Sequence, residues 1–268
     1  MDYRPFMEEC ERIVRRVGSL IRKKVGHVQV YEKGPADLVT EADLAAQELV
    51  RELLTQSHPE HLLIGEEDSA QWRASHDPRN TEFAWIVDPI DGTTNYAHGV
   101  PFYCVSLAMA HRGELVVGAI FDPNQDECFS ASRGHGAFLN GRPIHPSPTT
   151  HLDHALFATS FPAHVQRDDP DVRCFMRIVD RTQSIRRTGS AALNLAYVAC
   201  GRFDVASAYK TKLWDFAAGT VLVQESGGVI TTWRGEPIPL ADTPHLATAT
   251  PELSETLLAC TREIEGIR

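Results

Sequence analysis

Two aspartates three residues apart follow an apolar run in the first half of the chain. Residues 82–97 read EFAWIVDPIDGTTNYA, so that Asp88 and Asp91 stand directly after the apolar residues 83–87. A buried strand has no use for carboxylates unless something compensates their charge. Asp88 and Asp91 are therefore candidate ligands for a cation.

The residues around Asp91 indicate an anion beside that cation. Gly92 and Thr93 follow at once, where a chain that turns into a helix exposes backbone N–H groups to an anion. A metal ion and an anion at one strand end suggest phosphate chemistry. The alternative is a hairpin closed at Asp91-Gly92, since Asp-Gly dipeptides favour such turns. Pro89 and Ile90 between the acids make a poor hairpin but a rigid bracket for ligands.

A second short apolar segment also ends in carboxylates. Residues 61–64 (HLLI) are followed by Gly65, Glu66, Glu67 and Asp68. A solvated acidic turn would account for this segment alone. Two consecutive apolar segments that end in acids favour a shared site, because neighbouring strand ends can converge on one cation.

A third candidate ligand is Asp215. Apolar and small residues dominate positions 214–224 and predict a buried helix that begins near Asp215. Asp is a favoured N-cap residue, so a purely structural role competes with metal binding. A capping carboxylate can still be a ligand, because its second oxygen remains available.

Together these segments resemble the signatures of the inositol monophosphatase family. GEE at 65–67, DPIDGTTN at 88–95 and WDFAAG at 214–219 match three family motifs in order and approximate spacing. Further family-like segments are DLVTEAD at 37–43, GHGAFLNG at 134–141 and RRTGSAAL at 186–193, the last as in bacterial members. The resemblance covers roughly residues 30–230.

The hydrophobic periodicity predicts a mixture of helices and strands. Apolar residues at helical spacing predict helices at 6–25 and 40–54. Thr40 is expected as the N-cap of the second helix, with Asp43 at its third position. Alternating segments then predict an antiparallel meander with strands at 104–110, 115–122 and 127–130.

A proline-rich stretch at 143–151 divides the chain into an α+β half, residues 1–147, and an α/β half, residues 148–268. Helices alternate with short strands in the second half, and these are expected at 156–159, 171–182, 184–187, 190–200, 204–208, 215–225 and near Val229. The family resemblance implies that the whole packs as a layered α-β-α-β-α sandwich, usually a homodimer.

The candidate ligands suit a hard divalent ion. Four acids from three separate segments, with no Cys or His among them, fit Mg²⁺ better than Zn²⁺. We therefore expect Mg²⁺ as the cofactor, and hydrolysis of a phosphate monoester at two metals. The resemblance implies that Glu66, Asp88 and the Ile90 carbonyl hold one ion. It implies a second ion on Asp88, Asp91 and Asp215.

The resemblance also assigns catalytic roles. Thr93 would relay a proton from the metal-bound water and Asp43 would orient Thr93, although an acid that favours the helix dipole explains Asp43 equally well. Glu67 would orient the water or contact a weak third ion, so that two or three Mg²⁺ ions are expected. The backbone N–H groups of Gly92 and Thr93 would cradle the phosphate.

The substrate side departs from the family pattern. Gly189, Ser190 and Ala191 resemble the segment that meets substrate hydroxyls. Inositol-cleaving relatives typically carry a Glu seven residues before the WD aspartate, where this chain has Ala208. This change disfavours myo-inositol 1-phosphate as the substrate. Lys210 nearby either pairs with a second anionic group of the substrate or is an exposed loop residue.

Composition limits the partners and the compartment. The chain has 268 residues, and its formal charge of −10 argues against nucleic acid or an anionic membrane as the principal partner. Bound cations reconcile that charge with a small phosphorylated substrate. The six cysteines lack metal-binding spacing and are interpreted as core thiols of a reducing compartment. No secretory signal or membrane span is visible, so a cytoplasmic protein is expected.

Two classes of function remain. The first is a Mg²⁺-dependent phosphatase, lithium-sensitive by resemblance, that acts on an inositol monophosphate-like or other sugar or polyol phosphate. Alternative substrates in that class are fructose 1,6-bisphosphate, 3′-phosphoadenosine 5′-phosphate and histidinol phosphate. The second class is a non-catalytic metabolite-sensing or regulatory protein of the same fold. The presence of every candidate ligand favours the first class.

Overall fold

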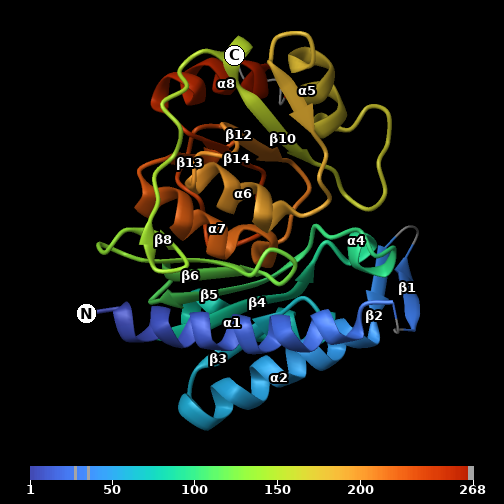
Figure 1. The fold of residues 1–268 in the computed structure, drawn as a ribbon, viewed down its shortest axis with the longest axis vertical. Helices are drawn as coiled ribbons and strands as arrows, with labels where there is room; N and C mark the ends of the chain where they lie inside the picture. The colour runs from blue at the N-terminus through green and yellow to red at the C-terminus, as the bar shows by residue number, and fades with distance from the viewer. Residues whose placement is uncertain (27–28, 35–36, 265–268) are drawn as a thin grey trace.

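The computed structural model describes residues 1–26, 29–34 and 37–264. Helix pairs and sheets alternate as stacked layers (Figure 1). The pairs are α1 (Arg4–Lys24) with α2 (Glu41–Ser57), α6 (Ala191–Ala199) with α7 (Leu213–Ser226), and α5 (Pro170–Ile178) with α8 (Pro251–Ile264). One sheet lies on each side of the α6–α7 pair, so the predicted α-β-α-β-α sandwich is confirmed.

The larger sheet belongs to the first half of the chain. It has seven strands in the order β3-β4-β5-β6-β7-β8-β9, and only β3 and β4 run parallel. Its strands are β3 (Leu62–Gly65), β4 (Phe83–Asp91), β5 (Cys104–His111), β6 (Glu114–Asp122), β7 (Glu127–Ser132), β8 (Ala137–Leu139) and β9 (Arg142–Pro143). The antiparallel meander β5-β6-β7 is confirmed.

The smaller sheet belongs to the second half. It has five strands in the order β11-β10-β12-β14-β13, in which β10 runs parallel to both of its neighbours. Its strands are β10 (Leu156–Ser160), β11 (Ser184–Arg186), β12 (Val205–Ala208), β13 (Val229–Thr232) and β14 (His245–Thr248). Both β14 and α8 are additions to the elements that the sequence pattern predicts. Residues 144–151 connect the two sheets.

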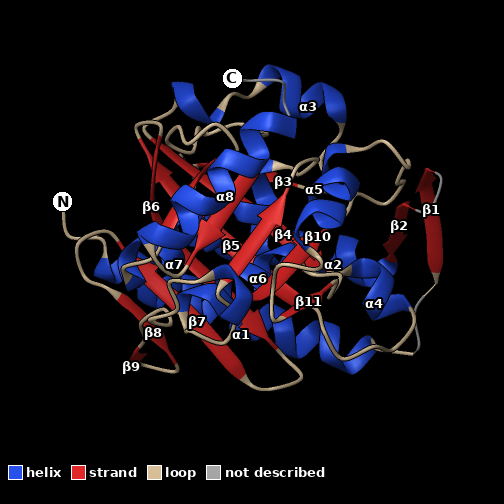
Figure 2. Cartoon of the chain, turned by 90° about the horizontal axis from the view of Figure 1, so that it is seen from above, coloured by secondary structure: helices blue, strands red, loops and turns tan. Residues whose placement is uncertain are grey.

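Shorter elements lie around these layers. A hairpin of β1 (Val30–Gly34) and β2 (Asp37–Thr40) stands at the edge of the molecule beside α4 (Thr93–Ala97), as the view from above shows (Figure 2). The remaining elements are α3 (Ala70–Ser75) and 3₁₀ turns at Pro78–Asn80 and Leu152–His154. None of the helices in the described part of the chain has the length and apolar character that a bilayer span requires.

The helix α2 begins where the sequence predicts. Thr40 is its N-cap, and the Thr40 side chain accepts a hydrogen bond from the backbone of Ala42. Asp43, the third residue of the helix, accepts hydrogen bonds from the Thr40 backbone N–H at 2.8 Å and from the Thr40 hydroxyl at 2.6 Å. This reciprocal cap satisfies donors that the first turn of a helix leaves open.

The helix α7 lies at the centre of the molecule. Nearly all of its residues are buried, and it contacts strands of both sheets. It sits so close to β6 that a Cβ on Gly118 would lie 2.4 Å from the Ala218 carbonyl oxygen. The apolar core around α7 therefore joins the two sheets into one packed body.

Candidate active site

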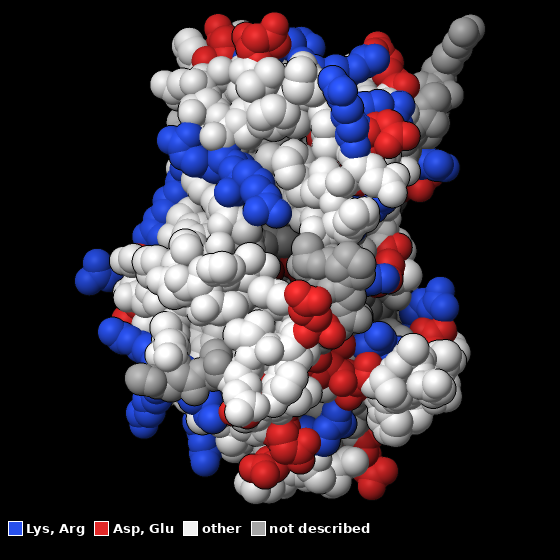
Figure 3. All heavy atoms as spheres, turned by 90° about the vertical axis from the view of Figure 1, so that its right-hand side faces the viewer, with Lys and Arg blue, Asp and Glu red and all other residues white. Residues whose placement is uncertain are grey.

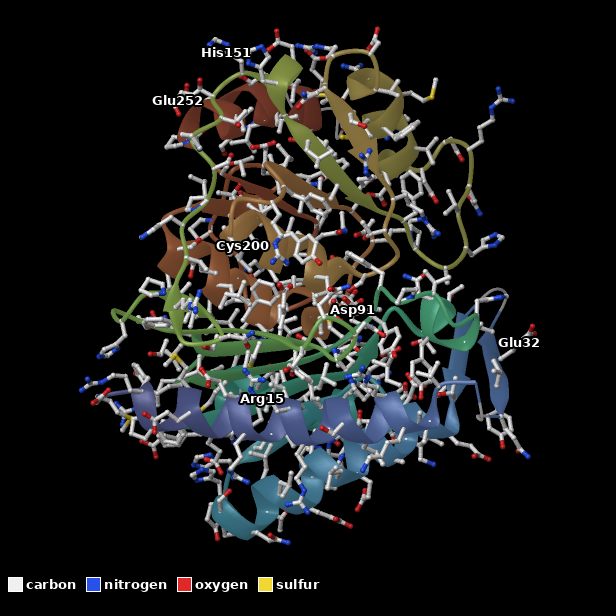
Figure 4. The ribbon with its side chains drawn as sticks, viewed as in Figure 1. Arg15, Glu32, Asp91, His151, Cys200 and Glu252 are labelled. Carbon is white, nitrogen blue, oxygen red and sulfur yellow. The ribbon has the colours of Figure 1, made fainter. Side chains whose placement is uncertain are left out.

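A cavity of about 620 Å³ opens between the two sheets. We call its lower wall the floor, formed by Glu66, Asp91, Gly92, Thr93 and Asp215, and its upper wall the roof, formed by Ser160–His164, Arg187, Gly189, Lys210 and Lys212. Asp91 lies at the end of β4, facing the α6–α7 layer (Figure 4). On the face seen in Figure 3, Lys and Arg gather above a central hollow and Asp and Glu gather below it.

The strand β4 carries both aspartates of the central motif. It continues through Asp88 to Asp91, and its pairing with β5 is irregular between these two residues. Residues three apart on a regular strand point to opposite faces, so this irregularity lets the two carboxylates approach each other. The chain then enters α4 at Gly92, whose φ is 101°. The alternative of a hairpin at Asp91-Gly92 is therefore wrong.

The floor concentrates negative charge out of water. Asp88 is 2% exposed and Asp91 8% exposed. Burial raises the pKa of Asp88 well above its usual range, and repulsion from Glu66, Asp91 and Asp215 raises it further. The pKa of Asp215 is also raised, first by burial and then by Asp91. Such a cluster is the environment in which a divalent cation offsets the repulsion.

Asp91 is held by the helix that follows β11. Its carboxylate accepts hydrogen bonds from the Ser190 hydroxyl at 2.5 Å and from the backbone N–H groups of Ala192 at 2.7 Å and Ala191 at 3.2 Å. Ser190 is fully buried and absent from the cavity wall. This placement argues against the predicted substrate contact of Ser190, whose hydroxyl instead fixes Asp91 and caps α6.

The prediction that Asp215 is the N-cap of α7 is wrong. The helix begins at Leu213, and Lys212 occupies the cap position. The Leu213 N–H donates to Asp242 at 2.9 Å, which starts the helix earlier than the sequence pattern predicts. Asp215 therefore lies in the first turn, where its Oδ2 accepts from the Lys212 N–H at 2.8 Å.

Thr93 and Asp43 meet across 50 residues of sequence. The Thr93 hydroxyl lies 3.3 Å from Asp43 Oδ1 and 3.0 Å from the Ile90 carbonyl oxygen, so its single hydrogen has two acceptors to choose from. The other oxygen of Asp43 serves the cap of α2. One carboxylate thus both contacts the Thr93 hydroxyl and caps α2, and the catalytic role of Asp43 stays a prediction.

The acids after β3 separate onto two surfaces. Glu66 lines the main cavity, whereas Glu67 lines a smaller hollow with Arg51, Asp68 and Trp72. The Asp68 carboxylate fixes this turn by accepting from the backbone of Gly65 at 2.8 Å and from Arg51 at 2.6 Å. The position of Glu67 argues against its predicted role in orienting a water in the main cavity.

The roof contains the remaining predicted residues. Gly189 and Ala191 line the cavity, and so does Lys210, which forms an ion pair of 2.5 Å with Asp169. Ala208, which stands where relatives carry a Glu, is 1% exposed and is absent from the cavity wall.

Three cavity residues were not singled out from the sequence. Asn95 donates through Nδ2 to the carbonyls of Phe102 at 2.7 Å and Thr188 at 2.8 Å, and so links floor to roof. Its place in DPIDGTTN is the signal that could have found it. Arg187 likewise lies in RRTGSAAL. Arg73, whose guanidinium carbon lies 5.1 Å from the centre of the Trp214 ring, had no such signal.

The floor has the side chains that a divalent ion needs, but they are not arranged as a metal site. Within the described residues, no group of His, Cys, Asp or Glu side chains is already assembled as a metal site. Protein donors occupy oxygens of Asp88, Asp91 and Asp215, the first through the Ile90 N–H at 3.1 Å. The donor set consists of buried and half-buried carboxylates, which Mg²⁺ accepts readily. Asp88 and Asp215 accept these hydrogen bonds through one oxygen each, whereas both oxygens of Asp91 are used.

Comparisons with known proteins agree with this picture. The model of the inositol monophosphatase family matches residues 2–265. The Nus factor SuhB of Pseudomonas aeruginosa is 38% identical over 237 residues, with 86% of each chain covered. An inositol-1-monophosphatase of Synechocystis is 38% identical over 264 residues, covering 96% of this chain and 90% of its own.

Solved structures have the same fold. The IMPase TM1415 of Thermotoga maritima superimposes with a TM-score of 0.87 at 30% identity, with 98% of each chain covered. An IMPase/NADP phosphatase complexed with Mg²⁺ and phosphate gives a TM-score of 0.80 at 26% identity, covering 91% of this chain and 90% of its own. With a phosphatase fold, and a family match that spans almost its whole length, this chain belongs to the inositol monophosphatase family.

Proposed function

We propose that this protein hydrolyses a small phosphate monoester with the help of Mg²⁺. One observation carries the proposal: carboxylates from three separate segments gather at a single cavity, where burial, followed by repulsion from the neighbouring acids, raises the pKa of Asp88 and Asp215. A buried cluster of like charges destabilises a fold unless a counter-charge compensates it, and functional sites are where such clusters concentrate. The comparison protein complexed with Mg²⁺ and phosphate supports both the ion and the substrate class.

The metal ligands follow from the family resemblance and the floor. Glu66, Asp88 and the Ile90 carbonyl would hold one Mg²⁺ ion, and Asp88, Asp91 and Asp215 a second. Bound Mg²⁺ would supply a water of lowered pKa and offset the charge that develops on the leaving oxygen. Because Glu67 lies outside the main cavity, two ions rather than three are expected there.

Protein groups would position the substrate and move the proton. The Thr93 hydroxyl would accept a proton from the attacking water and pass its own hydrogen to Asp43 Oδ1, which lies 3.3 Å away. Backbone N–H groups at Gly92 and Thr93 would hold the phosphate. Gly189 and Ala191 would contact the rest of the substrate, while Ser190 would keep Asp91 in place.

A regulatory role is the second candidate. The Pseudomonas aeruginosa relative is named a Nus factor, at the same 38% identity as the Synechocystis phosphatase. A binding protein of this fold would keep the cavity but have no need for turnover. By resemblance, either form would be a homodimer, which light scattering of the purified protein tests directly.

Phosphate release separates the two candidates. The panel comprises myo-inositol 1-phosphate, fructose 1,6-bisphosphate, 3′-phosphoadenosine 5′-phosphate and histidinol phosphate, each with Mg²⁺ and with a chelator. We expect Mg²⁺-dependent turnover of at least one substrate, inhibition by lithium, and loss of turnover in Asp91→Asn. Lys23→Gln, which removes an exposed charge on α1, is the matched control. A panel with no Mg²⁺-dependent phosphate release would favour the regulatory role.

A further inference from the structure

The roof of the cavity is assembled from three loops that share one sheet edge. Strands β11, β10 and β12 are adjacent and parallel, so their carboxyl ends meet at the same edge. Ligands of open α/β sheets bind outside the carboxyl ends of the strands. The loops that follow these strands contribute His164, Arg187 and Lys210 to the cavity. The topology therefore makes this edge the substrate side of the site.

The charge of the roof is opposite to that of the floor. Arg187 is exposed, and it forms no ion pair or hydrogen bond with any other residue that the structure describes. Lys212, also in the roof, is paired at 3.0 Å with Asp242, which does not line the cavity. Arg187 and Lys210 are thus cations in the same cavity as the carboxylates but on its other wall. A phosphate bound at the floor would leave both side chains available to another part of the substrate.

The position of Lys210 is fixed by the start of α5. Its ammonium lies 2.5 Å from Asp169, whose side chain is only 6% exposed. The second oxygen of Asp169 accepts the Gln166 N–H at 2.8 Å. Asp171, 2% exposed, accepts the Tyr209 N–H at 2.7 Å and so anchors the backbone beside Lys210. Two buried carboxylates from one helix therefore hold one loop.

This arrangement orients the lysine without using all of its donors. An ammonium group has three N–H donors, and Asp169 takes one of them. The Lys210 side chain remains 47% exposed and lines the cavity. An ion pair at this exposure contributes little to stability by itself. Stability alone therefore does not explain why two buried acids, Asp169 and Asp171, hold the loop that carries Lys210.

We propose that Lys210, positioned by Asp169 and Asp171, acts with Arg187 to bind a second anionic group, so that the preferred substrate is a phosphate monoester carrying a second phosphate. The inference rests on the proposed phosphatase function and specifies its substrate class. Lys210 and Arg187 contact the substrate, whereas Asp169 and Asp171 are positioning residues. The second phosphate belongs either to a sugar or to a nucleotide, since both present the same dianion.

The test compares substrates that differ by one phosphate. Fructose 1,6-bisphosphate is paired with fructose 1-phosphate, and adenosine 3′,5′-bisphosphate with adenosine 3′-monophosphate. In at least one pair, we expect a KM for the bisphosphate about five- to tenfold below that for the monophosphate, with similar kcat. Lys210→Gln should remove this difference by raising only the KM for the bisphosphate, and Lys210→Arg should restore part of it. Asp169→Asn should act in the same direction with a smaller change.

Controls separate this inference from the proposed function. Lys23→Gln removes an equal charge from an exposed residue of α1 that does not line the cavity, and it should leave both KM values unchanged. If no substrate is turned over, the phosphatase proposal itself fails. If the monophosphates and bisphosphates are turned over with equal KM, or if Lys210→Gln changes both equally, only the second-anion inference is overturned. A lower melting temperature in Asp169→Asn with unchanged selectivity would show that the contact between Asp169 and Lys210 serves stability and not substrate binding.

Discussion

The floor and the roof of the cavity are built in opposite ways. Most of the acids at the floor stand on regular elements, with Asp88 and Asp91 on β4 and Asp215 in the first turn of α7, while Glu66 lies in the turn directly after β3. The roof cations stand in loops, and Lys210 is held there by side chains from another helix. Acids of the floor are buried or half-buried and repel one another, whereas the roof cations are exposed, and Lys210 and Lys212 among them are paired with acids. A bound cation would therefore offset the repulsion among the floor acids, whereas single acidic side chains offset the charges of Lys210 and Lys212.

This difference decides which residues a short sequence motif can reveal. On a strand or helix, neighbours in sequence fix where a side chain points, so DPIDGTTN identifies the central part of the floor, from Asp88 to Thr93. In a loop, the position of a side chain depends on residues distant in the chain, such as Asp169 for Lys210, 41 positions away. Functional loops are therefore the part of such a site that needs a three-dimensional structure.

The largest expected effect is at the floor. Asp88→Asn removes a carboxylate predicted to serve both ions, and a loss of several kcal/mol of transition-state stabilisation would lower kcat/KM by about a thousandfold. Mg²⁺ should raise the melting temperature of the wild type through binding linkage, and by less in the variant. Steady-state kinetics and calorimetry with and without Mg²⁺ measure both quantities. Unchanged turnover would mean that the floor is not the catalytic wall.

A smaller loss is expected at the proton relay. Thr93→Val keeps the shape but removes the hydroxyl that lies beside Asp43, and loss of general acid–base help should lower kcat by about a hundredfold. Thr93→Ser retains the hydroxyl and should keep most of the activity. The comparison is made by phosphate release at saturating substrate. Equal activity of the Val and Ser variants would contradict the relay.

The link between floor and roof should contribute to stability. Asn95→Ala removes both hydrogen bonds from Nδ2 to the carbonyls of Phe102 and Thr188. Leaving these partly buried groups without partners should lower the free energy of unfolding by about 1–3 kcal/mol. Urea unfolding followed by tryptophan fluorescence measures it. Asn80→Ala, at an exposed 3₁₀ turn, is the control and should change little.

The smallest effect concerns pH and the anchor of the roof. Burial raises the pKa of Asp171 from 3.8 to about 7. The folded protein therefore keeps this proton up to about pH 7, while the unfolded chain releases it near 3.8. The contribution of Asp171 to the free energy of unfolding is complete below pH 3.8 and is lost as the pH rises through about 7. Asp171→Asn should thus gain stability relative to wild type between pH 4.5 and 7.5, measured by thermal unfolding across that range. A constant difference would show that Asp171 does not titrate there.

Part of the fold was accessible from sequence because it is local. The Thr40–Asp43 cap lies within one helical turn, and the meander alternates in its own segment. By contrast, β14 has only four residues and is defined by pairing with β12 and β13, which are distant in sequence. Neighbouring residues carry no information on that pairing.

The site shows the same division. The acids of the floor could be predicted because each stands at one end of an apolar run, Glu66, Asp88 and Asp91 after it and Asp215 at its start. The role of Ser190 could not, because its acceptor Asp91 lies 99 positions away. The start of α7 was misplaced for a similar reason, since Asp242 receives the first N–H of the helix. In both cases a hydrogen-bond acceptor that is distant in sequence determines the role of the residue or the start of the helix.

The central helix α7 has a consequence for how this chain can be divided. It packs against both sheets and carries Asp215 to a floor whose other carboxylates come from β3 and β4. A polypeptide cut between residues 144 and 151 would yield two fragments, each with an incomplete set of metal ligands and an uncovered apolar surface. Neither fragment should hydrolyse phosphate esters alone. Mixing them with Mg²⁺ should restore activity by complementation, with the ion bridging two separate polypeptides.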